Sequence, residues 1–75
     1  MNNQLNRIRR VKAANEKKWL ALPEVVGVGI GATSTGETGI IVSVKENPQK
    51  IREKIPAEIS GVPIEIRETG EFKAL

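Results

Sequence analysis

The sequence contains no cysteine, no histidine and no aspartate. Without cysteine the chain has no disulfide and no thiolate ligand, and without histidine it lacks the commonest nitrogen ligand for a metal. Every side-chain carboxylate is a glutamate, which argues against aspartate-rich calcium loops. In a chain of only 75 residues, we therefore expect neither cross-links nor a metal site, and we expect no cofactor.

Aromatic residues and long apolar runs are also scarce. Trp19 and Phe72 are the two aromatic residues, so we expect a core of isoleucine, valine and leucine. The sequence contains no run of about 20 apolar residues, the length that a membrane-spanning helix needs. Lys17 and Lys18 precede the stretch WLALPEVVGVGIGA, but Pro23 interrupts it, unlike the apolar region of a signal peptide. The sequence predicts a cytoplasmic protein without membrane contact.

The side chains that common enzyme mechanisms require are missing as well. Three serines are present, but no histidine can activate them and no lysine stands in a recognisable arrangement as a base. Glu65 and Glu68 would point to opposite faces of a strand, so they do not form an acid–base pair. We therefore expect no catalytic residue and infer that the protein is not an enzyme.

The apolar periodicity predicts a small α+β domain. Apolar residues follow a helical period over residues 3–22, and Pro23 ends that helix. Asn47 and Pro48 suit the start of a second helix, which Pro56 stops. Alternating patterns predict strands over 24–31, 40–45 and 62–68.

This α-β-β-α-β order predicts a two-layer sandwich covering the whole of residues 1–75. We expect a basic amphipathic helix (1–22), a β-β-α-β unit (23–70) and a tail (71–75) in which Phe72 and Leu75 pack back. The first two strands should form an antiparallel hairpin, and a crossover should lead to the third. The simplest arrangement is a three-stranded sheet in the order 2-1-3 with both helices on one face.

Glycines alternate along the first predicted strand. Strand alternation places Gly27, Gly29 and Gly31 on one face, opposite Val26, Val28 and Ile30. Such a face allows close approach, either by the first helix or by the backbone of a partner peptide. The GVGIG run is not a phosphate loop, because a polar turn and a second strand follow it in place of a helix. GETG (36–39) has the spacing of the nucleic-acid clamp of KH domains, but flanking strands favour a hairpin turn.

The positive charge is concentrated in the first 22 residues. They carry six basic side chains and one glutamate, a net charge of +5, whereas residues 23–75 carry six basic and eight acidic side chains, a net charge of −2. Arg7, Arg10, Lys17 and Lys18 share the polar half of the first helix. This face is either solvated or contacts an anionic partner. Nucleic acid would bind it through phosphates, because no predicted strand carries an aromatic residue.

Three segments resemble a known family. LPEVVGVGIG, TGIIVSVKEN and IPAEISGVPIEIRETGEFKAL resemble the segment that precedes the protease domain in narrow-leaf-type trypsin-like serine proteases and their bacterial relatives. The likeness covers roughly Leu22 to Gly70. The chain stops where the protease domain would begin, so no triad residue can be assigned. The resemblance implies a pro-segment-like accessory module with an adjacent protease domain or a peptide as its partner.

Two functions remain open from the sequence. The first is a non-catalytic protein-interaction module that uses a sheet edge, such as that of the third strand, or the face of Gly27, Gly29 and Gly31. The alternative is a small nucleic-acid-binding protein that uses Arg7, Arg10, Lys17 and Lys18. The oligomeric state stays open.

Overall fold

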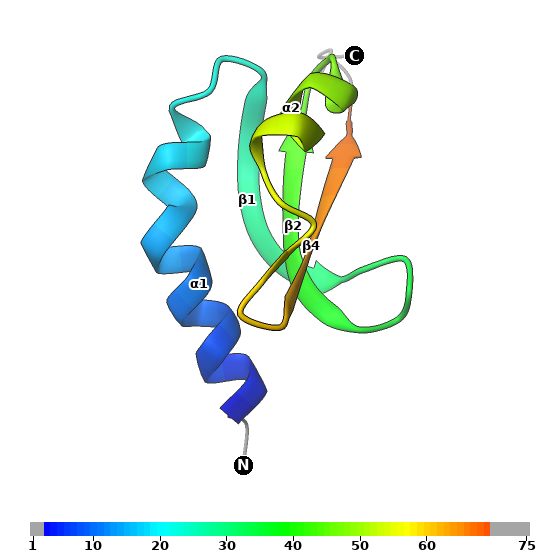
Figure 1. The fold of residues 1–75 in the computed structure, drawn as a ribbon. Coiled ribbons are helices and arrows are strands. Elements are labelled where there is room, and N and C mark those ends of the chain that lie inside the picture. Colours follow the sequence, from blue (N-terminus) through cyan, green and yellow to red (C-terminus); the bar gives the residue numbers. More distant parts are fainter. Residues whose placement is uncertain (1–2, 70–75) are drawn as a thin grey trace, which may run out of the picture.

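The computed structural model describes residues 3–69 and confirms an α+β fold (Figure 1). The predicted tail, with Phe72 and Leu75, lies outside the described residues. The predicted element order holds, with one short strand added before the last. The elements are α1 (Asn3–Leu20), β1 (Val25–Ala32), β2 (Thr38–Val44), α2 (Pro48–Lys54), β3 (Glu58–Ile59) and β4 (Val62–Glu68).

The long helix α1 ends two residues before its predicted end. The Leu22 amide donates to the Trp19 carbonyl oxygen at 3.0 Å, which forms a tight turn ahead of Pro23. Arg9 and Lys12 interrupt the apolar stripe of α1, but Ile8 beside them is fully buried.

The sheet order is β1-β2-β4-β3, so the predicted order 2-1-3 is wrong. The predicted third strand, β4, pairs in parallel with β2 rather than with β1. The first hairpin is antiparallel as predicted, and β3 pairs with the start of β4. Burial explains the difference. The inward residues of β2 are fully buried, as expected for a central strand, whereas the glycine-rich β1 carries half-exposed residues at the edge.

A β-bulge changes which residues of β1 face the core. Val28 and Ile30 lie opposite Val42 and Ile40, but the register shifts between Val25 and Gly27. A bulge adds one residue to a strand and so inverts the alternation beyond it. Val25 is therefore buried against the core, and Val26, predicted to share a face with Val28 and Ile30, is 45% exposed.

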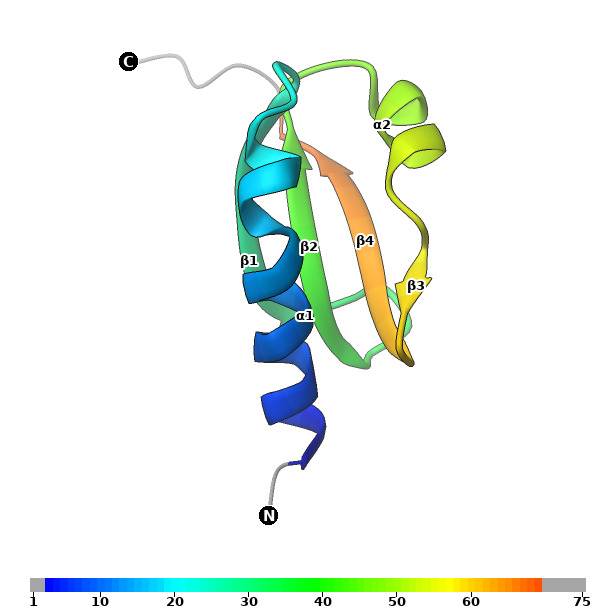
Figure 2. The ribbon, with the colours of Figure 1, turned by 60° about the vertical axis from the view of Figure 1, so that its left-hand side comes forward.

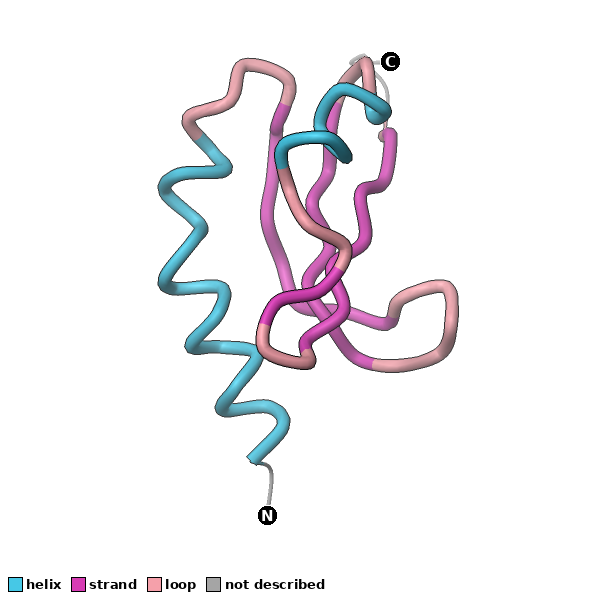
Figure 3. Tube along the Cα trace, in the orientation of Figure 1, coloured by secondary structure: helices cyan, strands magenta, loops and turns pink. Residues whose placement is uncertain are grey.

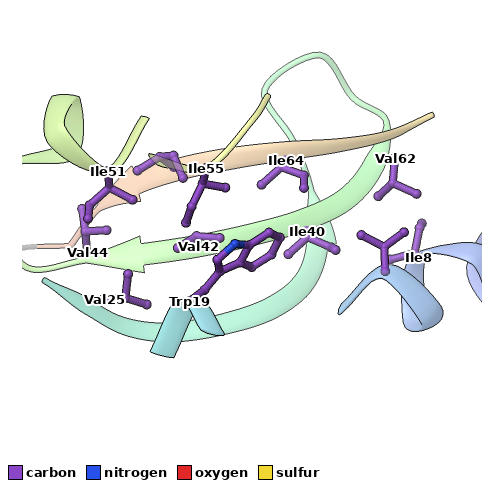
Figure 4. Packing of buried hydrophobic residues seen from close by; sticks show 12 residues of the cluster. Ile8, Trp19, Val25, Ile40, Val42, Val44, Ile51, Ile55, Val62 and Ile64 are labelled. Atoms are coloured by element: carbon purple, nitrogen blue, oxygen red, sulfur yellow. The ribbon is translucent and has the colours of Figure 1, made fainter. Parts of the chain in front are cut away.

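One apolar cluster joins both helices to one face of the sheet (Figure 4). Trp19 points from α1 toward the strand that carries Val42 and Ile40, and it is only 2% exposed. The short helix α2 adds Ile51 and Ile55. Figure 2 shows α1 in front of β1 and β2, with α2 beside β4. The opposite face of the sheet has no helix over it within residues 3–69.

Close approach of β4 to β2 depends on Gly39. A Cβ atom at this position would overlap the carbonyl oxygen of Pro63 and lie 2.8 Å from its Cγ. Interiors have no room for such an overlap, so another residue would push the strands apart. Pro63 is the second residue of β4, near the beginning of the strand, where a residue without an amide donor is tolerated.

Two turns depend on left-handed backbone. Asn47 is the N-cap residue of α2, as predicted, but it has φ 54° and its side chain makes no cap hydrogen bond. Asparagine suits the position because it tolerates this conformation. Ser60 (φ 51°) and Gly61 (φ 79°) form the two-residue connection between β3 and β4. Positive φ at both residues is the requirement of a type I′ hairpin turn.

Candidate binding surfaces

The outer edge of β1 presents unpaired backbone groups. The Thr33 amide donates to the Glu37 carbonyl oxygen at 2.8 Å, which fixes the alternation of the antiparallel ladder. Bonded and non-bonded positions alternate along such a pair. The backbone groups of Gly29 therefore point toward β2, and those of Val28 and Ile30 point away from the sheet. This edge offers two amides and two carbonyls to another strand.

The large exposed apolar side chains lie on β1 and on the helix that packs against it. The large exposed hydrophobic residues among the described ones are Val26 (45%), Leu20 (43%) and Ile30 (38%). None of the eight residues of β1, VVGVGIGA, is charged or a proline. Natural edge strands are normally protected by charges, proline or a covering element. β1 has neither a charge nor a proline within its own length, and its one covering element among the described residues is α1 on the core face.

The three glycines of β1 do not receive helix α1. Gly27, Gly29 and Gly31 lie on the face opposite the core, because Val28 and Ile30 pair with core residues. Beyond its chain neighbours, no atom lies within 4 Å of the position that a Cβ on Gly29 would occupy. The expectation that α1 packs on this face is therefore wrong. Because these residues have no side chains, the backbone of β1 is accessible on the face opposite the core.

The other side of the sheet is more enclosed. β3 covers the start of β4, and the Ile64 amide donates to the Ala57 carbonyl oxygen at 2.8 Å. Arg52 donates to the outward carbonyl of Ile66 at 3.4 Å. A groove of about 560 Å³ runs beside this edge, between α2 and the loop 33–37. The sequence predicts an exposed edge on the third predicted strand, β4, but β3 covers the first half of that edge. The contact of Arg52 with the second half was not predicted.

Glu65 ties the first hairpin to β4. Its carboxylate accepts a hydrogen bond from the Ser34 amide at 2.7 Å and another from Arg67 Nε at 3.1 Å. These bonds favour the ionised form and lower the pKa of Glu65 to about 2. Arg67 also donates to the Ala32 carbonyl oxygen at 3.4 Å. Figure 3 shows the loop 33–37 reaching the β4 side of the sheet. Glu65 therefore shapes the groove as an anchored carboxylate.

Glu24 anchors the opposite end of the sheet. The residue precedes β1, and its Oε2 atom pairs with Lys50 Nζ of α2 at 3.1 Å. The hydrogen bond from Lys50 is the main reason that the pKa of Glu24 lies below its usual value. Its Oε1 atom is buried without a partner among the described residues. The pair holds the α1–β1 turn to α2.

The four basic residues selected from the sequence do not all line one groove. Arg7 and Arg10 line a groove of about 330 Å³ between α1 and the β3–β4 turn. Lys17 and Lys18 lie near the other end of α1 and do not line it. Sequence spacing places all four on one half of the helix, but it does not show which of them lie beside another element.

Neither a metal-binding group nor a membrane-spanning helix is found among residues 3–69. Residues 3–69 contain no group of three or more side chains that could hold a metal ion. Ser34 lies in the first hairpin loop, Ser43 in β2 and Ser60 in the β3–β4 turn. No helix within the described range is long and apolar enough to cross a membrane. The main candidate surfaces are therefore the β1 edge and the two grooves.

Comparisons with known proteins add no family. A scan against protein-family models and searches of curated proteins and of solved structures find no match to this chain.

Proposed function

We propose that this protein is a non-catalytic interaction module that binds an extended peptide segment of a partner protein by strand addition to β1. The single observation that carries the proposal is the unprotected edge of β1. Val28 and Ile30 direct their backbone groups outward, and no charge or proline interrupts the eight residues. Main-chain hydrogen bonds supply affinity in this mode of recognition, and alternate side chains supply specificity.

The two faces of β1 define the peptide that fits. On the core side, a bound strand would place alternate residues beside Ile30, which favours apolar side chains there. On the other side it would meet Gly27, Gly29 and Gly31, over which longer side chains can lie. The partner segment is therefore extended and apolar at every second residue. An adjacent protease domain, which the family resemblance suggests, is one protein that could supply such a segment.

A fluorescence titration tests the proposal. The probe is a labelled ten-residue peptide of alternating valine and threonine, blocked at both ends. We expect saturable binding that Ile30→Lys weakens at least about tenfold, because lysine on an edge strand opposes pairing. Gln49→Lys adds the same charge on α2 and should leave binding unchanged. Equal binding by both variants would contradict the proposal.

A second variant separates backbone from side chain. N-methylation of the Ile30 amide, introduced by chemical synthesis, removes one outward donor and keeps the side chain. We expect it to weaken the peptide as strongly as Ile30→Lys while the thermal melt stays cooperative. Sedimentation of the free protein tests whether a second copy of the chain occupies the β1 edge. A dimer that Ile30→Lys abolishes would mean that a second copy, rather than a partner peptide, occupies β1.

The nucleic-acid alternative rests on the charge of α1. Arg7 and Arg10 share a groove that Lys17 and Lys18 do not line, so the groove alone does not bring the four charges together. A nucleic-acid complex would weaken steeply as salt rises, whereas strand addition would change little. The same titration with a mixed DNA and RNA oligonucleotide at two salt concentrations distinguishes the two functions.

A further inference from the structure

A groove beside α1 combines two arginines with an apolar floor. It lies between α1 and the β3–β4 turn and has a volume of about 330 Å³. At the floor, Val11 is buried and Ile59 is partly buried against the core. Arg7 and Arg10, three residues apart on α1, stand on one flank of the helix. The lining residues are Arg7, Arg10, Val11, Ala14, Asn15, Ile59 and Ser60.

The two positive charges in this groove have no internal counter-charge. The ion pairs among the described residues involve neither Arg7 nor Arg10, and no carboxylate lines the groove. Arg7 lies against the turn, since its Nη1 atom is 3.5 Å from the position of a Cβ on Gly61. Guanidinium groups stay charged at every physiological pH. The groove is therefore a permanently positive site with a hydroxyl, that of Ser60, beside it.

We propose that this groove binds a phosphate monoester, with the phosphoryl group on Arg7 and Arg10 and the attached organic group on the apolar floor. A phosphate monoester carries a charge of about −1.5 to −2 at pH 7, which matches two arginines better than a single carboxylate does. The arginine fork also bonds phosphate oxygens in pairs. The proposal is independent of peptide binding at β1.

NMR titration of the ¹⁵N-labelled protein at 150 mM NaCl tests this assignment. The probes are phenyl phosphate, benzoate of similar shape, inorganic phosphate and a six-residue oligothymidylate without a terminal phosphate. We expect phenyl phosphate to shift the side-chain Nε–H signals of Arg7 and Arg10 and the amides of Ser60 and Gly61. Benzoate and inorganic phosphate should bind more weakly, because each lacks either the second charge or the apolar group.

Two double variants with the same change in net charge make the test specific. Arg7→Gln with Arg10→Gln should weaken phenyl phosphate at least about tenfold, because two charged donors are lost. Lys17→Gln with Lys18→Gln should leave its affinity within about twofold. A thermal melt checks that both variants fold. Substitution of both arginines by lysine, which keeps the charge, should also weaken binding because the forked geometry is lost.

Three outcomes would overturn the proposal. Equal weakening by the two glutamine double variants would show that the helix attracts anions only through its net charge. Equal or tighter binding of benzoate would assign the groove to carboxylates. Tighter binding of the oligothymidylate, with shifts extending to Lys17 and Lys18, would assign the helix to nucleic acid.

Discussion

The two sides of the sheet are built in opposite ways. β1 has eight residues without a charge or proline, and its outward backbone groups at Val28 and Ile30 face no other strand. β4 has a proline at its second position, ends in charged residues, pairs with β3 and receives Arg52 at an outward carbonyl. Charge, proline and cover are the devices by which proteins prevent unwanted pairing. The difference indicates that the β4 side closes the sheet and the β1 side leaves it open.

Replacing a glycine by alanine should change the free energy of unfolding most at Gly39, which contacts β4, and far less at Gly29 in β1. Gly39→Ala places a methyl group on the Pro63 carbonyl, so we expect a loss of at least about 2 kcal/mol in the free energy of unfolding. Gly29→Ala meets open space and should stay within about 1 kcal/mol of the parent protein, on the stabilising side. Urea denaturation measures both. Equal losses would contradict the contrast between the two sides.

Acidification should break the hydrogen bonds by which Glu65 ties the first hairpin loop to β4. Its pKa in the folded protein, about 2, lies below the ordinary 4.5, so its stabilising effect is complete above pH 4.5 and is lost as the pH falls toward 2. We expect the amide shift of Ser34 to titrate near pH 2. Glu65→Gln should remove that titration and leave the amides of β1 unaffected. A Ser34 titration near 4.5 would show that the hydrogen bond is not made.

The smallest effect is expected at the β3–β4 turn. Ser60 has φ 51°, a conformation that asparagine adopts more readily than serine. Ser60→Asn creates the Asn-Gly pair preferred in type I′ turns and should stabilise the protein by about 0.5 kcal/mol. Calorimetry would show a small rise in Tm. A fall in Tm would mean that the Ser60 hydroxyl contributes more than the turn conformation.

The sequence predicted the local elements well because local patterns determine them. The strand over 62–68 and the end of α2 before Pro56 follow from alternation and from proline. Strand order depends on which strands pack side by side, and this is not a local property. No local pattern shows that the backbone of Pro63 packs against Gly39. The fourth strand, β3, is only two residues long and gives no periodicity.

The candidate surfaces were predicted in part, for related reasons. Gly27, Gly29 and Gly31 could be assigned to one face, but the alternation alone did not tell whether that face is covered. The bulge near Val26 also left no sequence signal, since a bulge is a property of pairing. Arg7 and Arg10 were selected by charge. Their separation from Lys17 and Lys18 became visible only when the β3–β4 turn was placed beside α1.

Hydrogen exchange of the strand amides tests the central claim, that the β1 edge is open and accepts a strand. In the free protein we predict fast exchange at Val28 and Ile30 and slow exchange at Gly29, whose amide faces β2. Saturation with the valine–threonine peptide should slow Val28 and Ile30 and leave the β4 amides unchanged. Peptide-induced protection at Ile66 and Glu68, or slow exchange at Val28 and Ile30 before any peptide is added, would contradict the claim.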